Sequence, residues 1–163
     1  MLLDDEVLAV ILAVVVIASI LGVALTLRDY YSVEPFTALG LLDSSCKIGD
    51  YPKRVIPGDN VTLCIYVYNH EGKPIYWSVV YKIGSNETLP TQEKPSSQPP
   101  IAEWRGVLSH GANETRIIVI TIPKELKIGE KVALIFELWL YDAGRMEWVY
   151  SGRWNHLYVS VVG

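Results

Sequence analysis

The sequence predicts an all-β protein: an immunoglobulin-like β-sandwich of seven or eight strands, preceded by one N-terminal transmembrane α-helix. Three observations carry this prediction: an uncharged apolar run near the N-terminus, repeated short runs of β-forming residues between turn signals, and ten Tyr and five Trp against two Phe. The 163 residues are enough for one domain with a short appendage. The expected parts are a short acidic tail, a transmembrane helix, a juxtamembrane linker and an extracytoplasmic β-sandwich, over residues 1–6, 7–28, 29–35 and 36–163.

The apolar run from Val7 to Leu27 contains no charged residue. As an α-helix its 21 residues would be about 32 Å long, which matches the hydrocarbon core of a bilayer. A cleaved secretory signal begins with basic residues and has a shorter apolar stretch, whereas this chain begins Met-Leu-Leu-Asp-Asp-Glu. We therefore expect a retained anchor in the lipid bilayer. Small residues spaced four apart form a candidate helix-packing face: Ala9 with Ala13, and Ala18 with Gly22.

Two signals conflict on which side of the membrane the domain lies. Arg28 follows the apolar run and no Lys or Arg precedes it, so a literal positive-inside count places the domain in the cytoplasm by one charge. Three N-glycosylation sequons follow the run, at Asn60, Asn86 and Asn113, and none has Pro in the middle position. We give the sequons more weight. They predict a single-pass cell-membrane protein whose domain lies outside and carries N-linked glycans.

The two cysteines, Cys46 and Cys64, form a candidate disulfide, which would require an oxidising compartment. Two free buried thiols are the alternative, and the sequence leaves both open. Neither cysteine belongs to a CxxC motif or a Cys/His cluster. The pair therefore gives no indication of a metal or redox role.

Strand predictions come from β-forming runs bounded by Gly, Pro, Asn and Asp. In residues 61–68, aliphatic residues alternate with aromatic or polar ones, as in a half-buried strand. The segment Ser85 to Pro100 holds four of the nine prolines and no apolar pattern, which predicts a long surface loop. The predicted strands cover residues 36–42, 60–68, 75–83, 101–108, 115–122, 131–141, 147–150 and 153–162.

Catalytic, cofactor-binding and metal sites are not predicted, and we expect a protein that is not an enzyme. The three histidines have no ligand spacing with another His, Cys or carboxylate: His70, His110 and His156. No Gly-x-Ser-x-Gly elbow is present. Acidic loop residues fit turn formers better than calcium ligands: Asp43, Asp50, Asp59 and Glu71. Five tryptophans can line a sugar-binding face, but packing is their commoner use: Trp77, Trp104, Trp139, Trp148 and Trp154. The net charge of −4 leaves no basic stripe, which excludes nucleic acid.

Several stretches resemble one known family. They are Lys47-Ile48-Gly49-Asp50-Tyr51-Pro52, Tyr68-Asn69-His70-Glu71-Gly72, Pro99-Pro100-Ile101-Ala102-Glu103, Phe136-Glu137-Leu138-Trp139 and Gly152-Arg153-Trp154-Asn155-His156-Leu157. Together, over about residues 34 to 162, they resemble an archaeal family of membrane proteins, domain of unknown function 1616. The resemblance implies membrane helices joined to an outer β-domain, and this chain departs from longer members by having one apparent helix. The family supplies no functional residues to carry over.

These observations predict a non-catalytic accessory, adhesion or binding protein of an archaeal cell envelope, with a protein partner in or near the membrane that could be a second copy. The alternative is a structural subunit of an extracellular pilus-like or archaellum-like filament with the N-terminal helices in its core. Pilin precursors begin with a short basic leader that ends at Gly, and this chain shows no such site, so the filament is the second expectation.

Overall fold

The structure is a computed structural model that describes residues 4–30 and 34–163, with the side chains of 28–30 excluded. The chain divides into two compact units between Glu34 and Pro35. The side chain of Arg28, on which the positive-inside count depends, and residues 31–33 of the predicted linker lie outside the described part. The fold is mostly β-sheet with an apolar N-terminal helix, which confirms the sequence prediction at that level.

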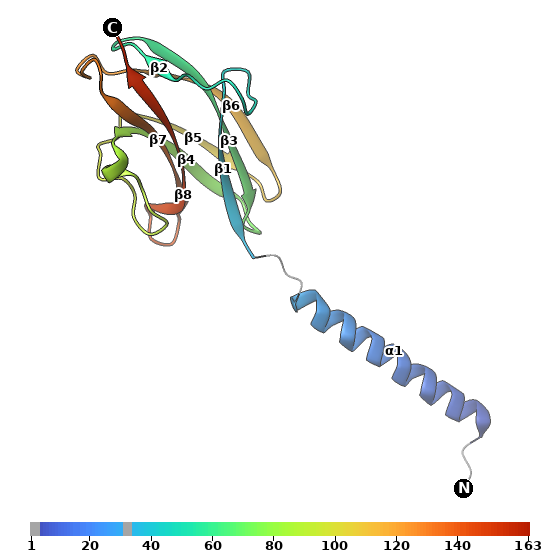
Figure 1. The fold of residues 1–163 in the computed structure, drawn as a ribbon. Helices are drawn as coiled ribbons and strands as arrows, with labels where there is room; N and C mark the ends of the chain where they lie inside the picture. Colours follow the sequence, from blue (N-terminus) through green and yellow to red (C-terminus); the bar gives the residue numbers. More distant parts are fainter. Residues whose placement is uncertain (1–3, 31–33) are drawn as a thin grey trace. The chain divides into compact units, whose positions relative to one another are not determined.

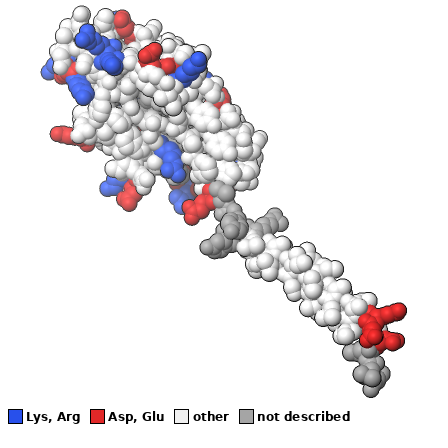
Figure 2. Space-filling view, turned by 45° about the vertical axis from the view of Figure 1, so that its right-hand side comes forward, with Lys and Arg blue, Asp and Glu red and all other residues white. Residues whose placement is uncertain are grey.

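Helix α1 spans Asp5–Tyr30, and its segment Asp5–Leu27 is long and apolar enough to cross a membrane, with a mean hydropathy of 3.1. Asp5 and Glu6 lie in the first turn, where acidic side chains interact favourably with the helix dipole. In Figure 2, the described side chains of the helix after this acidic start are uncharged. The hydroxyls of Ser19 and Thr26 donate to carbonyls one turn earlier, so both hydroxyls have a hydrogen-bond partner within the helix.

The small residues of α1 do not form the single packing face that the sequence predicts. Ala18 and Gly22 lie nine residues after Ala9 and Ala13, and nine residues at 3.6 per turn rotate the chain by roughly 180°. The four residues therefore form two pairs on opposite sides of the helix. All four are exposed.

The described residues of the second unit form eight strands in two sheets (Figure 1). The three-stranded sheet is antiparallel, in the order β1 (Phe36–Leu42), β3 (Asn60–His70), β6 (Asn113–Thr121). The five-stranded sheet has the order β2 (Arg54–Val55), β8 (Glu147–Val161), β7 (Lys131–Asp142), β4 (Ile75–Gly84), β5 (Ala102–Leu108). Only β2 and β8 run parallel among these pairs. A short 3-10 helix, η1 (Asn86–Thr88), follows β4.

One hydrophobic core takes side chains from both sheets. Alternate residues of β3 and β6 supply the three-stranded side, and Trp77 and Phe136 are the largest apolar side chains from the other sheet. Full burial of such a side chain stabilises the fold by about 1.5–3 kcal/mol. Gly106 of β5 permits this packing, because a Cβ there would lie 2.6 Å from Trp77 Cζ2.

Two strand predictions are wrong. The two strands predicted over 147–150 and 153–162 are one strand, β8, with a bulge at Ser151 and Gly152. Tyr150 pairs with Trp139 and Arg153 pairs with Leu138, which leaves these two residues without a partner on β7. Gly152 has φ +73° and lies against the Gln92 carbonyl, where a Cβ would be 2.7 Å from that oxygen. The short strand β2 is absent from the prediction because two residues carry no periodicity.

The loop after β1 is organised by Asp43. Its carboxylate accepts hydrogen bonds from the Ser45 hydroxyl and from the backbone amides of Ser45, Lys47 and Asp50. Asp43 is thus a turn former, as the sequence indicates. A disulfide joins Cys46 in this loop to Cys64 in β3, with a Cα–Cα distance of 5.2 Å. The loop is therefore held both by a covalent bond and by one carboxylate.

The hydrogen bonds to Asp43 predict a specific acid response. The Ser45 hydroxyl and then the Lys47 amide lower the pKa of Asp43 from 3.8 to about 2. The ionised Asp43 carboxylate therefore stabilises the folded state. This stabilisation is complete above the usual pKa near 4 and is lost as the pH falls through the lowered pKa. We expect Asp43→Asn to lower the melting temperature at pH 6. The difference in melting temperature between this variant and wild type should become smaller between pH 4 and pH 2. The matched control is Asp50→Asn. A gap that stays constant down to pH 2 would contradict the assignment.

Candidate binding surfaces of the β unit

The outer face of the five-stranded sheet, which points away from the core, is lined by aromatic rings. Trp139 packs on Tyr150 and Tyr141 on Trp148, with ring centroids 5.6 and 5.5 Å apart. Farther along β8, His156 packs between Trp154 and Tyr158. Of the five tryptophans, Trp77 is in the core and Trp104 packs against it, so three lie on the outer face. The bulge in β8 uses two residues, which keeps the aromatic positions before and after it on the same face.

A buried ion pair lies within this outer face. Lys82 Nζ is 2.9 Å from Glu137 Oε2, and their side chains are 6% and 0% exposed. Trp139 Nε1 donates to the same oxygen of Glu137 at 3.2 Å. A buried charge is tolerated when it is paired and fully hydrogen-bonded, and here both carboxylate oxygens have partners.

The proline-rich loop, residues 85–100, is fixed onto the outer face by this pair. The Ser96 amide donates to Glu137 Oε1, and the Ser96 carbonyl accepts from Lys82 Nζ at 2.8 Å. Nearer its start, the Thr91 carbonyl accepts from the Tyr150 hydroxyl at 2.9 Å. Figure 1 shows the loop in green to yellow-green beside β8. The sequence predicts the loop correctly, but local composition gives no signal for these hydrogen bonds to the sheet.

A pocket of about 320 Å³, the tryptophan pocket, lies beside Pro100, the last residue of this loop. It is lined by Trp139, Trp148, Pro100, Glu103, Ser78, Val80 and Lys82. Glu103 Oε1 is 2.8 Å from Arg105 Nη2, and the Arg105 guanidinium lies 5.1 Å from the centre of the Trp148 ring. Each ionic group at this pocket is therefore within salt-bridge distance of an opposite charge.

Burial shifts the pKa of two titratable groups on this face in the direction that favours their neutral forms. Burial, with a smaller effect from the Glu137 charge, raises the pKa of Tyr150 to about 12. Its neutral hydroxyl donates to the Thr91 carbonyl. Burial lowers the pKa of His156 below its usual 6.5, so its ring is neutral at pH 7.

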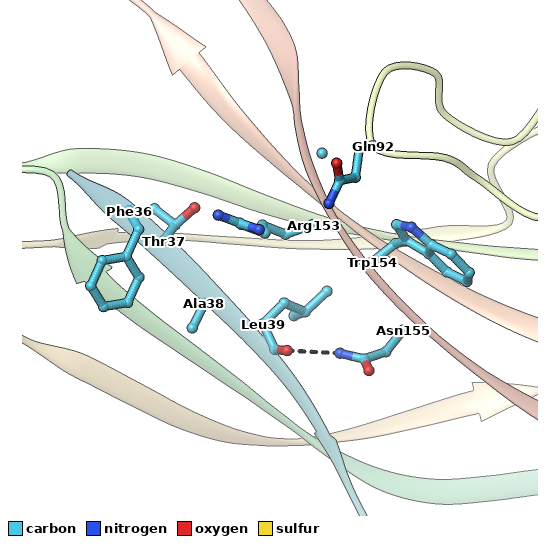
Figure 3. A pocket seen from close by; sticks show the side chains of 9 residues that line it. Phe36, Thr37, Ala38, Leu39, Gln92, Arg153, Trp154 and Asn155 are labelled. Atoms are coloured by element: carbon cyan, nitrogen blue, oxygen red, sulfur yellow. Dashed lines mark hydrogen bonds between the residues drawn. The ribbon is translucent and has the colours of Figure 1, made fainter. Parts of the chain in front are cut away.

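A second pocket of about 450 Å³ lies where the start of β1 approaches the bulge of β8 (Figure 3). Asn155 Nδ2 donates to the Leu39 carbonyl at 2.7 Å and so joins the two sheets. Arg153 extends toward Thr37 in this view, and Gln92 closes the loop side. Phe36 and Trp154 also line this pocket, and the rest of its lining includes the polar side chains of Thr37, Gln92, Arg153 and Asn155.

The sequon asparagines are exposed at the first residues of three elements: Asn60 of β3, Asn86 of η1 and Asn113 of β6. Asn60 Oδ1 accepts from the Thr121 hydroxyl and Asn86 Oδ1 from the Tyr158 hydroxyl, so neither contact uses the amide nitrogen that a glycan would modify.

The fold brings two of the histidines together. The rings of His70 and His110 lie 4.9 Å apart, and His110 Nδ1 accepts from the Gly72 amide. The third, His156, is on the other sheet. Within the described residues, no group of three or more His, Cys, Asp or Glu side chains is arranged to hold a metal ion.

No family model matches the chain, and no curated protein matches it. Among solved structures, the sporulation control protein Spo0M of Bacillus subtilis is 14% identical, with a TM-score of 0.47 over 78% of this chain and 49% of that one. A Listeria innocua β-glucosidase is 10% identical, with a TM-score of 0.48 over 79% of this chain and 16% of that one. The CARDB domain of a Pyrococcus furiosus protein is 13% identical, with a TM-score of 0.48 over 79% of this chain and 96% of that one. The chain thus spans about half of Spo0M and a small part of the β-glucosidase.

The buried pair predicts a large, non-additive loss of stability. Lys82→Met leaves the Glu137 carboxylate buried without its cation, which costs about 3–5 kcal/mol of unfolding free energy. Adding Glu137→Gln removes the charge but keeps an acceptor for Ser96, so the double variant is more stable than Lys82→Met alone. Urea unfolding, followed by tryptophan fluorescence, measures the unfolding free energy of the single and the double variant.

The matched control is Arg145→Met, because Arg145 is 70% exposed and pairs with Asp142 at 3.6 Å. An exposed pair of this kind contributes at most about 1 kcal/mol. If Lys82→Met costs no more than Arg145→Met, the buried pair is not a major source of stability.

Proposed function

We propose that this chain is a single-pass membrane protein whose β unit is an immunoglobulin-like β-sandwich outside the cell that acts by binding, as a non-catalytic accessory or adhesion protein of an archaeal envelope. The observation that carries the proposal is the 23-residue apolar span Asp5–Leu27 joined to a β unit with its own core. The archaeal assignment is an inference from the resemblance of the sequence motifs to domain of unknown function 1616.

Binding is supported by the character of the outer face. The tryptophan pocket is concave and largely apolar, with a few polar groups at fixed positions, which is the usual composition of a ligand site. The indoles of Trp139 and Trp148 are already held by contacts within the chain, so a ligand would not have to order them.

The outside orientation is supported by two independent features. The three sequon asparagines are exposed, as glycosylation requires. The bond between Cys46 and Cys64 is of a kind that persists in oxidising compartments and is rare in the cytosol. The positive-inside count favours a cytoplasmic β unit, but only by the single charge of Arg28. This signal is weaker than the sequons and the disulfide.

The filament subunit remains a second candidate because of the small residues of α1. With Ala9 and Ala13 on one side and Ala18 and Gly22 on the other, the helix could approach two neighbouring helices closely, as a subunit inside a helical bundle must. An anchor that is surrounded by lipid needs neither pair.

Topology can be tested with single cysteines, because both native cysteines are in a disulfide. Met146, in the turn between β7 and β8, is 79% exposed, and Asp4 precedes α1. We expect a membrane-impermeant maleimide to label Met146→Cys on intact cells and Asp4→Cys only after lysis. The reverse pattern would place the β unit in the cytoplasm. Release of the protein as polymers by shear, without detergent, would establish the filament instead.

Intact mass of the native protein gives a second, independent measure of orientation. Glycan mass on Asn60, Asn86 or Asn113 is expected if the β unit is outside. Replacement of each Asn by Gln in turn assigns the mass to a site. Bare asparagines together with cytoplasmic labelling would overturn the proposal.

A further inference from the structure

We propose that the tryptophan pocket binds the ring of a neutral pyranose sugar. This inference rests on the proposed binding function and names its ligand class. It does not depend on the topology of the membrane helix, so the labelling experiment above and the binding experiment below can fail separately.

Size and wall chemistry fit a sugar ring. The pocket volume of about 320 Å³ is at the lower end of the range for small-molecule sites, which suits one or two sugar units. Trp139 and Trp148 supply two aromatic walls, and Pro100 supplies a third apolar one. A pyranose presents a face of C–H groups with a slight positive charge, and the electron-rich face of an indole attracts such groups.

Polar groups stand where the hydroxyls of a stacked sugar would reach. Glu103 at the pocket can accept hydrogen bonds from two hydroxyls through its carboxylate. The Ser78 hydroxyl lies 3.4 Å from Glu103 Oε2 and can either donate or accept. A site for a sugar differs from a site for a purely hydrophobic ligand in having a few hydrogen-bonding groups among its apolar walls.

The charge balance selects a neutral sugar over a charged one. Lys82 is neutralised by Glu137, and Glu103 is 2.8 Å from Arg105. An anionic ligand such as a uronate or a phosphate would meet no unpaired cation at this pocket, and an amino sugar would meet no unpaired anion. A charged ligand would thus lose hydration without gaining an ion pair.

Both indoles are fixed before any ligand arrives. Trp139 is oriented by its hydrogen bond to Glu137 and lies below the Lys82 ammonium, which is 5.9 Å from the ring centre. Trp148 is held by Arg105 and by the edge-to-face contact with Tyr141. Such preorganisation reduces the entropy lost on binding.

The test titrates the full chain in lipid nanodiscs, because many detergents carry sugar headgroups that would occupy the site. The probes are the methyl pyranosides of glucose, mannose and galactose, with glucuronate and glucosamine as charged counterparts. Saturation-transfer difference NMR and quenching of tryptophan fluorescence report binding. We expect at least one neutral pyranoside to saturate with a millimolar dissociation constant, and ring C–H protons to receive the strongest transfer.

Trp148→Ala removes one stacking wall and is expected to weaken the neutral sugar by about tenfold. The matched control is Trp154→Ala on the same sheet face, because Trp154 does not line the pocket. The affinity of Trp154→Ala for the neutral sugar should equal that of wild type. Melting curves of both variants establish that they are folded.

Glu103→Gln tests the charge argument, because it leaves Arg105 without its partner. Glucuronate should bind this variant better, relative to the neutral sugar, than it binds wild type. Three outcomes would overturn the proposal: no saturable binding of any neutral pyranoside, an affinity of Trp148→Ala for the neutral sugar equal to that of wild type, or preference of wild type for a charged sugar.

Discussion

The constraint on which the outer face of this protein depends is the burial of Glu137. A carboxylate with no exposed surface on the outer side of a sheet needs a cation, hydrogen-bond donors and a cover that excludes water. Lys82 supplies the charge, and Trp139 and the Ser96 amide supply the donors. The cover is the loop 85–100 itself, so the ion pair and the loop each require the other.

This mutual dependence explains how a sequence with four prolines and no apolar pattern becomes part of the proposed binding surface. The loop leaves β4, lies over β8 at Thr91 and is held at Ser96, and it reaches β5 through Pro100, which forms a wall of the tryptophan pocket. The Glu137 carboxylate also orients Trp139, another residue that lines this pocket. Stability and the proposed sugar binding therefore depend on the same few atoms, and a change at Glu137 should affect both.

Local pattern predicts most of the strands because alternation of side chains is a property of each strand by itself. It fails at β8, where Ser151-Gly152 has the composition of a turn but forms a bulge, since the Ser151 hydroxyl bonds the Leu138 carbonyl of the neighbouring strand. It also cannot show which tryptophans face the core. In β7 both faces are largely apolar, and the tie from Ser96 to Glu137 joins residues 41 apart in sequence.

Amide hydrogen exchange at Ser96 tests the central claim most directly. The Glu93 amide in the same loop bonds only to the Thr91 hydroxyl, and it serves as the internal reference. If Glu137 fixes the loop, the Ser96 amide exchanges as slowly as the amides of β7, and Glu137→Ala raises its rate toward that of Glu93 while the core of the three-stranded sheet stays protected. A Ser96 amide that exchanges in wild type as fast as Glu93 would contradict the account.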